Sequence, residues 1–201
     1  MKRFIPILIT LIFASVAVAN AQKVAVKTNA LAWASTTPNV GFEFAMGDRW
    51  TVEVSGAYNP WTFNKEKNVK MKHWLASPEF RYWFCESFQG HFIGINGNYT
   101  RFNMSGIPLP NAFINLHSTA PTPDNFRDVR LAGWAVGAGL TYGYAFPIAR
   151  RWNMELTAGF GWWYTRHDQF ESRKCGMFQQ AVERHALGIT SLGISFIYLI
   201  K

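Results

Sequence analysis

The chain has 201 residues, a formal net charge of +8 and an aromatic content of 16 %, including 9 Trp, 7 Tyr and 17 Phe. That length is enough for one domain with a sizeable core. A basic chain invites comparison with nucleic-acid-binding proteins, but an N-terminal export signal argues against that class. We expect outer-membrane lipid and lipopolysaccharide phosphates as the electrostatic partners instead.

The first 21 residues are predicted to be a secretory signal peptide. Lys2 and Arg3 precede the apolar run 4–19, and Ala19-Asn20-Ala21 provides an A-x-A cleavage site before Gln22. Cleavage removes two positive charges and no negative ones, which leaves a formal net charge of +6. Residues 22–201 are then expected to form the folded domain.

The domain shows alternation of side-chain character at period two, which is typical of β-strands. Short turns are predicted at 47–48, 86–90 and 147–151, at one end of the strands, and longer connections at 64–72, 103–129 and 166–184, at the other end. The first connection at that other end, 35–38, is the one that is predicted to be short. Short periplasmic turns and longer extracellular loops are typical of outer-membrane barrels. The pattern predicts an all-β fold, an eight-stranded antiparallel up-and-down transmembrane β-barrel. The expected strands are 24–33, 39–46, 50–58, 73–84 (with a bulge or break at Pro78), 91–102, 131–146, 152–165 and 186–200.

The clearest strand is the segment 131–146. Its odd positions hold nothing larger than threonine, apart from Leu131 at the start, and its even positions are apolar and mostly bulky. A membrane strand needs ~9–11 tilted residues, so this segment is long enough to span. Glycines at GxxxG spacing also fit a packed membrane helix. However, Arg130 before the segment and Pro147 after it leave too short an apolar run for a helical span.

Charged residues within the predicted strands lie on the face opposite the aromatic residues. Charges facing lipid would be costly, so we expect a polar network in the lumen. An ion path is the alternative to a salt-bridged plug. We favour the plug, because an eight-stranded barrel is just wide enough for side chains to fill it. The predicted network comprises Lys27, Glu43, Glu53, Glu79, Arg81 and Glu155.

The same alternation fits a secreted lipocalin-like barrel, with the apolar face turned inward around a ligand. The aromatic content and the glycine-rich face of 131–146 favour lipid outside. Membrane partition separates these two readings.

Five short motifs in the first half of the domain stand out. They are Lys27-Thr28-Asn29, Thr36-Thr37-Pro38-Asn39, Tyr58-Asn59-Pro60-Trp61, Lys72-His73-Trp74 and Pro78-Glu79-Phe80-Arg81-Tyr82-Trp83. Together they resemble a family of small Bacteroidetes-type outer-membrane proteins of unknown function. The resemblance implies an OmpA-type eight-stranded barrel without established catalytic residues, and some members are associated with fimbrial gene clusters.

Catalytic and metal chemistry find little support. The five histidines have no metal-type spacing, and His167-Asp168, expected in the last outer loop, lacks a recognisable nucleophile motif nearby. Cys85 and Cys175 are expected at opposite ends of the barrel and therefore unpaired. We expect no enzyme activity and no cofactor.

The loop 103–129 is the best candidate for partner contact, since function in such proteins tends to lie in loops on a rigid scaffold. The expected role is a surface scaffold or interaction protein in the outer membrane of a Gram-negative bacterium, with a surface or fimbrial protein as partner and no nucleic acid. A narrow pore or a lipid-active barrel is the alternative. The apolar loop residues are Ile107, Leu109, Phe113, Ile114 and Leu116.

Overall fold

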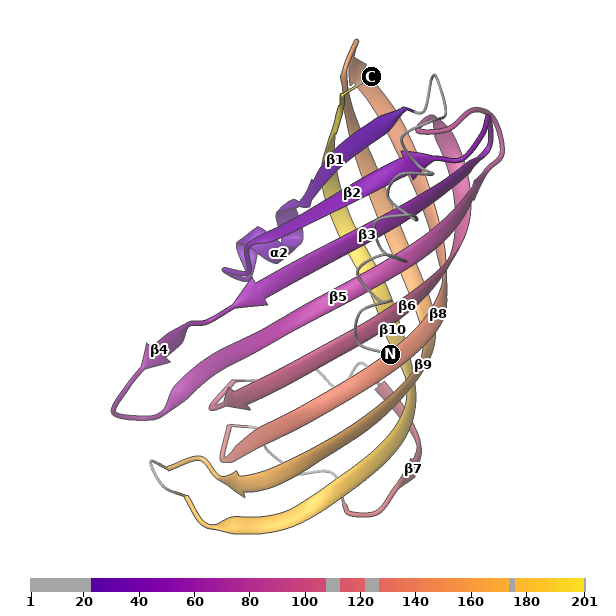
Figure 1. The fold of residues 1–201 in the computed structure, drawn as a ribbon. Coiled ribbons are helices and arrows are strands. Elements are labelled where there is room, and N and C mark those ends of the chain that lie inside the picture. Colours follow the sequence, from indigo (N-terminus) through magenta and orange to yellow (C-terminus); the bar gives the residue numbers. More distant parts are fainter. Residues whose placement is uncertain (1–22, 108–112, 122–126, 174–175, 201) are drawn as a thin grey trace, which may run out of the picture.

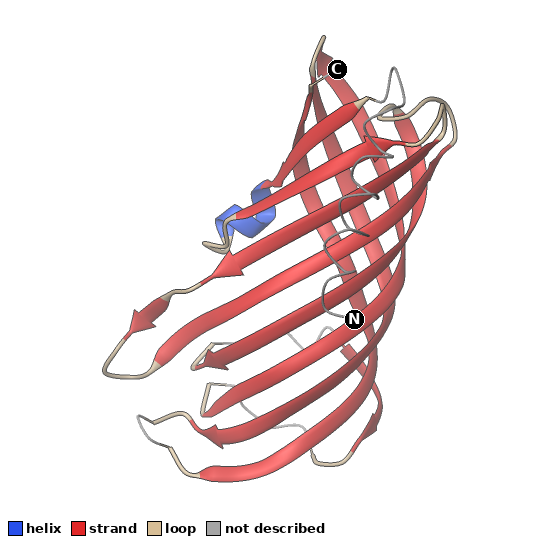
Figure 2. Ribbon diagram, in the orientation of Figure 1, coloured by secondary structure: helices blue, strands red, loops and turns tan. Residues whose placement is uncertain are grey.

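The computed structural model describes residues 23–107, 113–121, 127–173 and 176–200. Within them the chain forms one ten-stranded antiparallel sheet and one short helix (Figures 1 and 2). The predicted all-β antiparallel architecture is confirmed, and the predicted signal peptide lies outside the described residues. The elements are β1 (Val24–Asn29), α2 (Ala30–Ala34), β2 (Asn39–Ala45), β3 (Trp50–Asn59), β4 (Thr62–Asn64), β5 (Val69–Trp83), β6 (Gly90–Ser105), β7 (Phe113–Ser118), β8 (Val129–Ala149), β9 (Trp152–Glu171) and β10 (Phe178–Leu199).

Eight of the ten strands close into a ring, whose strands run obliquely in Figure 1. The order is β1-β2-β3-β5-β6-β8-β9-β10, and β10 pairs back onto β1, with Ala25 opposite Leu199. The two remaining strands are attached to the ring: β4 pairs with β5, and β7 pairs with β10. Of the helices in the described residues, none is long and apolar enough to cross a membrane.

The two ends of the ring differ in their connections. Short turns join β2 to β3, β5 to β6 and β8 to β9 at one end, which we call the turn end. At the other end, the loop end, three connections are longer and carry α2, β4 and β7, whereas the fourth, 172–177, has six residues like the turn 84–89. The predicted contrast between the two ends therefore holds for three of the four outer connections, and the alternation defines the direction in which every strand runs.

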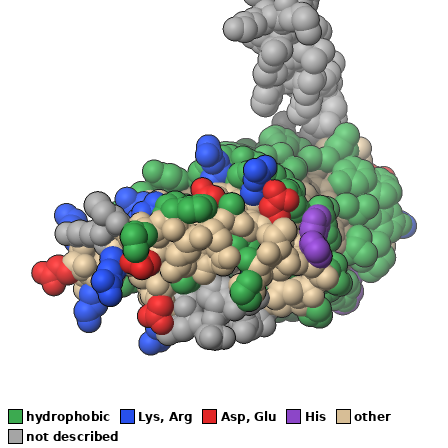
Figure 3. Space-filling model, turned by 90° about the horizontal axis from the view of Figure 1, so that it is seen from below, with side chains coloured by type: hydrophobic (Ala, Val, Ile, Leu, Met, Phe, Trp, Pro, Cys, Tyr) green, Lys and Arg blue, Asp and Glu red, His purple; other side chains and the backbone are tan. Residues whose placement is uncertain are grey.

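Inward and outward positions alternate along each strand. On β8, Thr141 and Ala145 point into the ring and are 2 % and 0 % exposed, whereas Leu140 between inward neighbours is 69 % exposed on the outside. The small residues of 131–146 therefore line the interior and the bulky ones cover the exterior. Figure 3, a view from below, shows hydrophobic side chains at the right and along the upper edge of the molecule, and charged ones at the left, where Figure 1 places β4, and in the upper middle.

The first predicted strand, 24–33, is too long, because the chain leaves the sheet at Asn29. The Asn29 side chain accepts a hydrogen bond from the backbone N–H of Leu31 at 3.0 Å and so caps α2. This is the preferred chemistry for the start of a helix. Residues 30–34 consequently form a helical turn beside β10 instead of continuing the strand.

Two of the predicted irregular connections are also wrong. Segment 103–129 contains β7, and most of segment 166–184 belongs to β9 and β10, which extend well beyond 165 and begin before 186. His167 and Asp168 thus lie in β9 and not in a loop. Similarly, β5 starts at Val69, inside the predicted connection 64–72. These extensions carry polar outward residues, so the apolar alternation used to set the boundaries ends before the strands do.

Pro78 interrupts the pairing of β5 with β6 without shifting it. Ala76 pairs with Tyr99 and Glu79 with Asn96, which is the same register on both sides of the gap. Proline lacks the N–H that a ladder needs. Of the two predicted alternatives, the structure therefore has a local break and no bulge.

Candidate functional site

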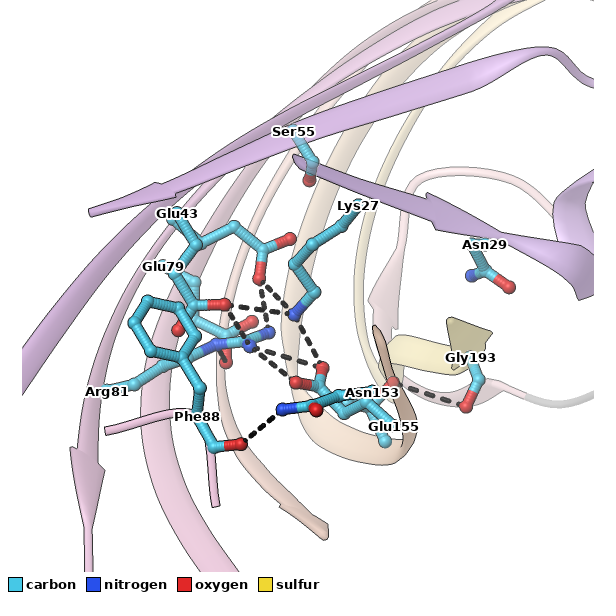
Figure 4. A network of polar contacts seen from close by, with 12 residues as sticks. Lys27, Asn29, Glu43, Ser55, Glu79, Arg81, Phe88, Asn153, Glu155 and Gly193 are labelled. Carbon is cyan, nitrogen blue, oxygen red and sulfur yellow. Dashed lines mark hydrogen bonds and ion pairs between the residues drawn. The ribbon is translucent and has the colours of Figure 1, made fainter. Parts of the chain in front are cut away.

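Six charged side chains from five strands converge inside the ring, five of them labelled in Figure 4. They are almost fully buried: Glu43 and Glu155 are 0 % exposed, and the most exposed, Glu53, is 8 %. The pairing register explains the convergence, because Lys27 lies diagonally across from Glu43, and Glu43, Glu53 and Glu79 are direct cross-strand neighbours. The structure brings together all six residues of the predicted network: Lys27, Glu43, Glu53, Glu79, Arg81 and Glu155.

Arg81 contacts all four carboxylates. Its Nε donates to Glu79 Oε1 at 2.8 Å, and its Nη2 lies 2.6 Å from Glu53 Oε2. Its Nη1 donates to Glu43 Oε2 at 3.2 Å and to both oxygens of Glu155 at 3.1 Å. The guanidinium also stacks 4.4 Å over the ring of Phe92. The planar five-donor geometry of arginine suits such a multiple contact.

Lys27 supplies the second cation and bridges three strands. Its Nζ donates to Glu155 Oε1 at 2.7 Å, Glu53 Oε2 at 2.8 Å and Glu43 Oε2 at 3.2 Å. Two cations among four carboxylates leave a formal charge of −2 if all are ionised. Buried charges are tolerated only when they are paired and hydrogen-bonded, so the removal of either cation should be strongly destabilising.

Hydrogen bonds extend the network toward the turn end. Thr51 Oγ1 donates to Glu43 Oε1 at 2.5 Å and accepts from the indole N–H of Trp83 at 3.0 Å. Trp83 and Phe92 are 0 % exposed and have ring centroids 4.7 Å apart. The charged cluster therefore sits directly on an apolar layer.

Phe88 completes this apolar layer and was missed by sequence reasoning. It lies in the turn between β5 and β6, with a φ of +70°, and is only 1 % exposed. Its carbonyl oxygen accepts a hydrogen bond from Asn153 Nδ2 at 2.7 Å. Trp83 could have been found, since it shares the strand face of Glu79 and Arg81. Phe88 lies in a turn and not in a strand, so the alternation of side chains does not predict that it points inward.

Glycines face the lumen around the network, because the neighbouring side chains leave no room for a further side chain at these positions. A Cβ on Gly94 would lie 2.6 Å from Glu79 Oε1, and one on Gly143 would collide with the ring of Phe92. Toward the loop end, the network borders a cavity of about 130 Å³ lined largely by small polar side chains. Beside the network, Asn96, the cross-strand neighbour of Glu79, donates from its Nδ2 to Thr141 Oγ1 at 2.6 Å. The interior can therefore hold buried charge, but it has little room for a ligand.

The residues considered for catalysis, metal binding and disulfide formation do not come together in the described part of the chain. His167 points inward and is 7 % exposed, whereas Asp168 points outward on the same strand, so the two do not form a dyad. In the described part of the chain, no cluster of His, Cys, Asp or Glu could hold a metal ion. Cys85 is a free, exposed thiol at the turn end, and Cys175 lies outside the described residues.

The predicted partner loop is partly a strand. Phe113 and Ile114 pair with Gly188 and Leu187 of β10, which fixes this part of the connection to the ring. Phe113, Ile114 and Leu116 are 48 %, 61 % and 56 % exposed. Ile107 precedes β7 and is half-buried, whereas Leu109 lies outside the described residues.

Comparison with known proteins identifies a family but no function. A family model described as protein of unknown function (DUF3575) matches residues 7–200, nearly the whole chain. No curated protein and no solved structure matches the chain.

Proposed function

The chain belongs to the DUF3575 family, and we propose that it is a non-enzymatic β-barrel of the outer membrane of a Gram-negative bacterium, acting as a surface scaffold. One observation carries the proposal: the ring is polar and charged inside and apolar outside. Arg81 and Glu155 are buried in its interior, whereas Leu140, Ile95 and Leu192 are 69 %, 64 % and 56 % exposed on its exterior. Such an exterior is costly in water and suits a hydrocarbon environment.

The height of the apolar exterior agrees with a bilayer. On β8 the outward positions from Trp134 to Phe146 are uninterrupted by charge. These twelve residue steps of ~3.3 Å, along a strand tilted by ~45°, span about 28 Å. Outer-membrane barrels have an apolar band of ~25 Å. Aromatic rings lie near both limits of the band, including Trp134 and Tyr164 at the loop end and Trp152 and Tyr198 at the turn end.

The orientation follows from the connections. Short turns face the periplasm in outer-membrane barrels, and longer connections face the outside. The turn end would thus be periplasmic, and the loop end with β4 and β7 would be extracellular. The resemblance to Bacteroidetes-type, OmpA-type proteins supports the same arrangement.

A plugged interior fits a scaffold better than the alternative of a narrow pore. The charge network joins β1, β2, β3, β5 and β9 across the lumen, and Trp83, Phe88 and Phe92 fill the interior next to it. The lipocalin-like alternative needs an apolar interior for its ligand, and the buried charges argue against it. The separation of His167 from Asp168 gives no support to hydrolysis or acyl transfer.

Partner binding is assigned to the loop end. Ile114 and Leu116 are exposed there on a strand whose second edge pairs with no other described strand. Exposed strand edges bind extended segments of other chains. A surface or fimbrial protein is the proposed partner, in line with the association of similar proteins with fimbrial gene clusters.

The proposal is tested by fractionation and gel mobility of the full chain. The expected result is an outer-membrane protein whose mobility changes on boiling and which gives no steady conductance in planar bilayers. A photo-crosslinking residue at Leu116 should give a protein adduct, whereas the same residue at Leu140, the matched lipid-facing control, should not. A soluble periplasmic protein without a heat shift would overturn the membrane assignment, and steady conductance would favour the pore.

A further inference from the structure

On the exterior of the loop end, basic residues follow within one or two outward positions after the aromatic residues. On β5 the outward sequence toward the loop end is Trp74, Lys72, Lys70, and on β6 Tyr99 is followed by Arg101. On β9 Tyr164 is followed by Arg166, and on β8 Trp134 is followed by Ala132 and then Arg130. Four neighbouring strands thus place five cations just beyond the apolar band.

Three of these cations surround one hollow on the outer face. Cross-strand pairing makes Trp74, Arg101, Trp134 and Arg166 consecutive neighbours around the ring. Together with Lys72 and Tyr58 they line a hollow of about 660 Å³, which also contains Asp168. The lining thus contains three cations, Lys72, Arg101 and Arg166, and one carboxylate. Lys70 and Arg130 lie next along their strands toward the loop end.

The positive charge of the hollow is poorly compensated. Arg166 forms an ion pair with Glu183, with 3.5 Å between Nε and Oε1. Lys72 and Arg101, in contrast, have no hydrogen-bond or ion-pair partner among residues 23–107, 113–121, 127–173 and 176–200. The pKa of Lys70 is lowered from its usual value, first by partial burial and then by repulsion from Arg130 and Lys72.

From this arrangement we propose that the hollow binds the phosphate-bearing headgroup of an anionic glycolipid, with Lys72 and Arg101 on the phosphate and Trp74 and Trp134 against the sugar ring. Arginine and lysine bind phosphate through charge-assisted hydrogen bonds, and aromatic rings at an interface offer an apolar face beside a polar edge. The inference deepens the proposed function and rests on its membrane orientation, because the site lies where outer-leaflet headgroups would be.

The experiment measures binding to the detergent-purified full chain. The probes are diphosphoryl lipid A, lipid A stripped of both phosphates, and inorganic phosphate. The variants are K72Q/R101Q and the matched control R150Q/R151Q, which removes two exposed arginines beside Trp152 at the turn end. We expect diphosphoryl lipid A to bind at least about tenfold more tightly than the stripped form, and K72Q/R101Q to lose about tenfold or more.

Four outcomes would overturn the site. These are equal binding of the two lipids, an equal loss in R150Q/R151Q, no loss in K72Q/R101Q, or inorganic phosphate binding as tightly as the lipid. Heat-modifiable mobility is recorded for every sample. Normal mobility with no selective binding refutes only the lipid site. A wild-type protein that shows no heat shift and no membrane partition refutes the barrel proposal itself.

Discussion

Arg81→Gln is the most informative perturbation of the interior. Arg81 is 2 % exposed and contacts four carboxylates at 2.6–3.2 Å. Without it, Lys27 alone faces Glu43, Glu53, Glu79 and Glu155, and the formal charge of the cluster changes from −2 to −3. The loss of one partner from a buried ion pair typically costs ~3–5 kcal/mol, and Glu79 would lose the only ion pair it has among the described residues. We expect a destabilisation of about 4 kcal/mol.

The measurement is equilibrium urea unfolding of protein refolded into lipid vesicles, followed by tryptophan fluorescence and by the mobility of unboiled samples. Arg81→Lys keeps the charge but loses the planar multiple contact, so it should fall between the wild type and Arg81→Gln. Arg150→Gln at the exposed turn should change stability by less than about 0.5 kcal/mol.

A double-mutant cycle with Glu155→Gln separates the network from a general packing defect. Removing one carboxylate relieves part of the charge excess that Arg81→Gln creates, so the double variant should be at least about 1 kcal/mol more stable than additivity predicts. A cost below about 1 kcal/mol for Arg81→Gln, or strict additivity in the cycle, would refute the view that these charges act as one paired unit.

Two further predictions address the exterior and the orientation. Leu140→Arg, at the middle of the outward face of β8, should lower the free energy of unfolding in vesicles by ~2–4 kcal/mol, whereas Ile148→Arg near the turn end should lower it by ~0–1 kcal/mol. The same urea titration measures both, and equal costs would argue against a lipid-facing band. In a C175S background, Cys85 should react with a membrane-impermeant maleimide only after the outer membrane is permeabilised, while K65C in a C85S/C175S background should react in intact cells. Labelling in the reverse order would invert the proposed topology.

Much of the ring was predictable because period-two alternation is a local signal. The buried network illustrates this. Glu43, Glu53 and Glu79 each lie on the strand face opposite the one that carries most of the aromatic residues, so the alternation of faces alone assigns them to the interior. Their mutual contact then follows from antiparallel pairing. Strand existence and side-chain direction both depend on the residue sequence within about ten positions.

Features that depend on distant residues or on single turns were not predictable in this way. The pairing of β7 with β10 joins Ile114 to Leu187, and no local pattern announces it. The end of β1 depends on one capping side chain, that of Asn29, in a segment whose apolar residues also fit a strand. The outer parts of β9 and β10 lose apolar alternation, because their outward residues, such as Arg166 and Glu183, lie beyond the apolar band.

The closure between β1 and β10 has a consequence for assembly. Every other pairing around the ring joins two ring strands that follow one another along the chain, but Ala25 and Leu199 are separated by 174 positions. The entropic cost of loop closure grows as about (3/2)RT ln n, so this pairing costs roughly 3 kcal/mol more than closing a turn of a few residues. β1 contributes only six residues to meet that cost. Closure should therefore be the last and slowest step of folding. In the closed ring, the backbone amides that pair β1 with β10 should exchange their hydrogens before those of the other strand pairs.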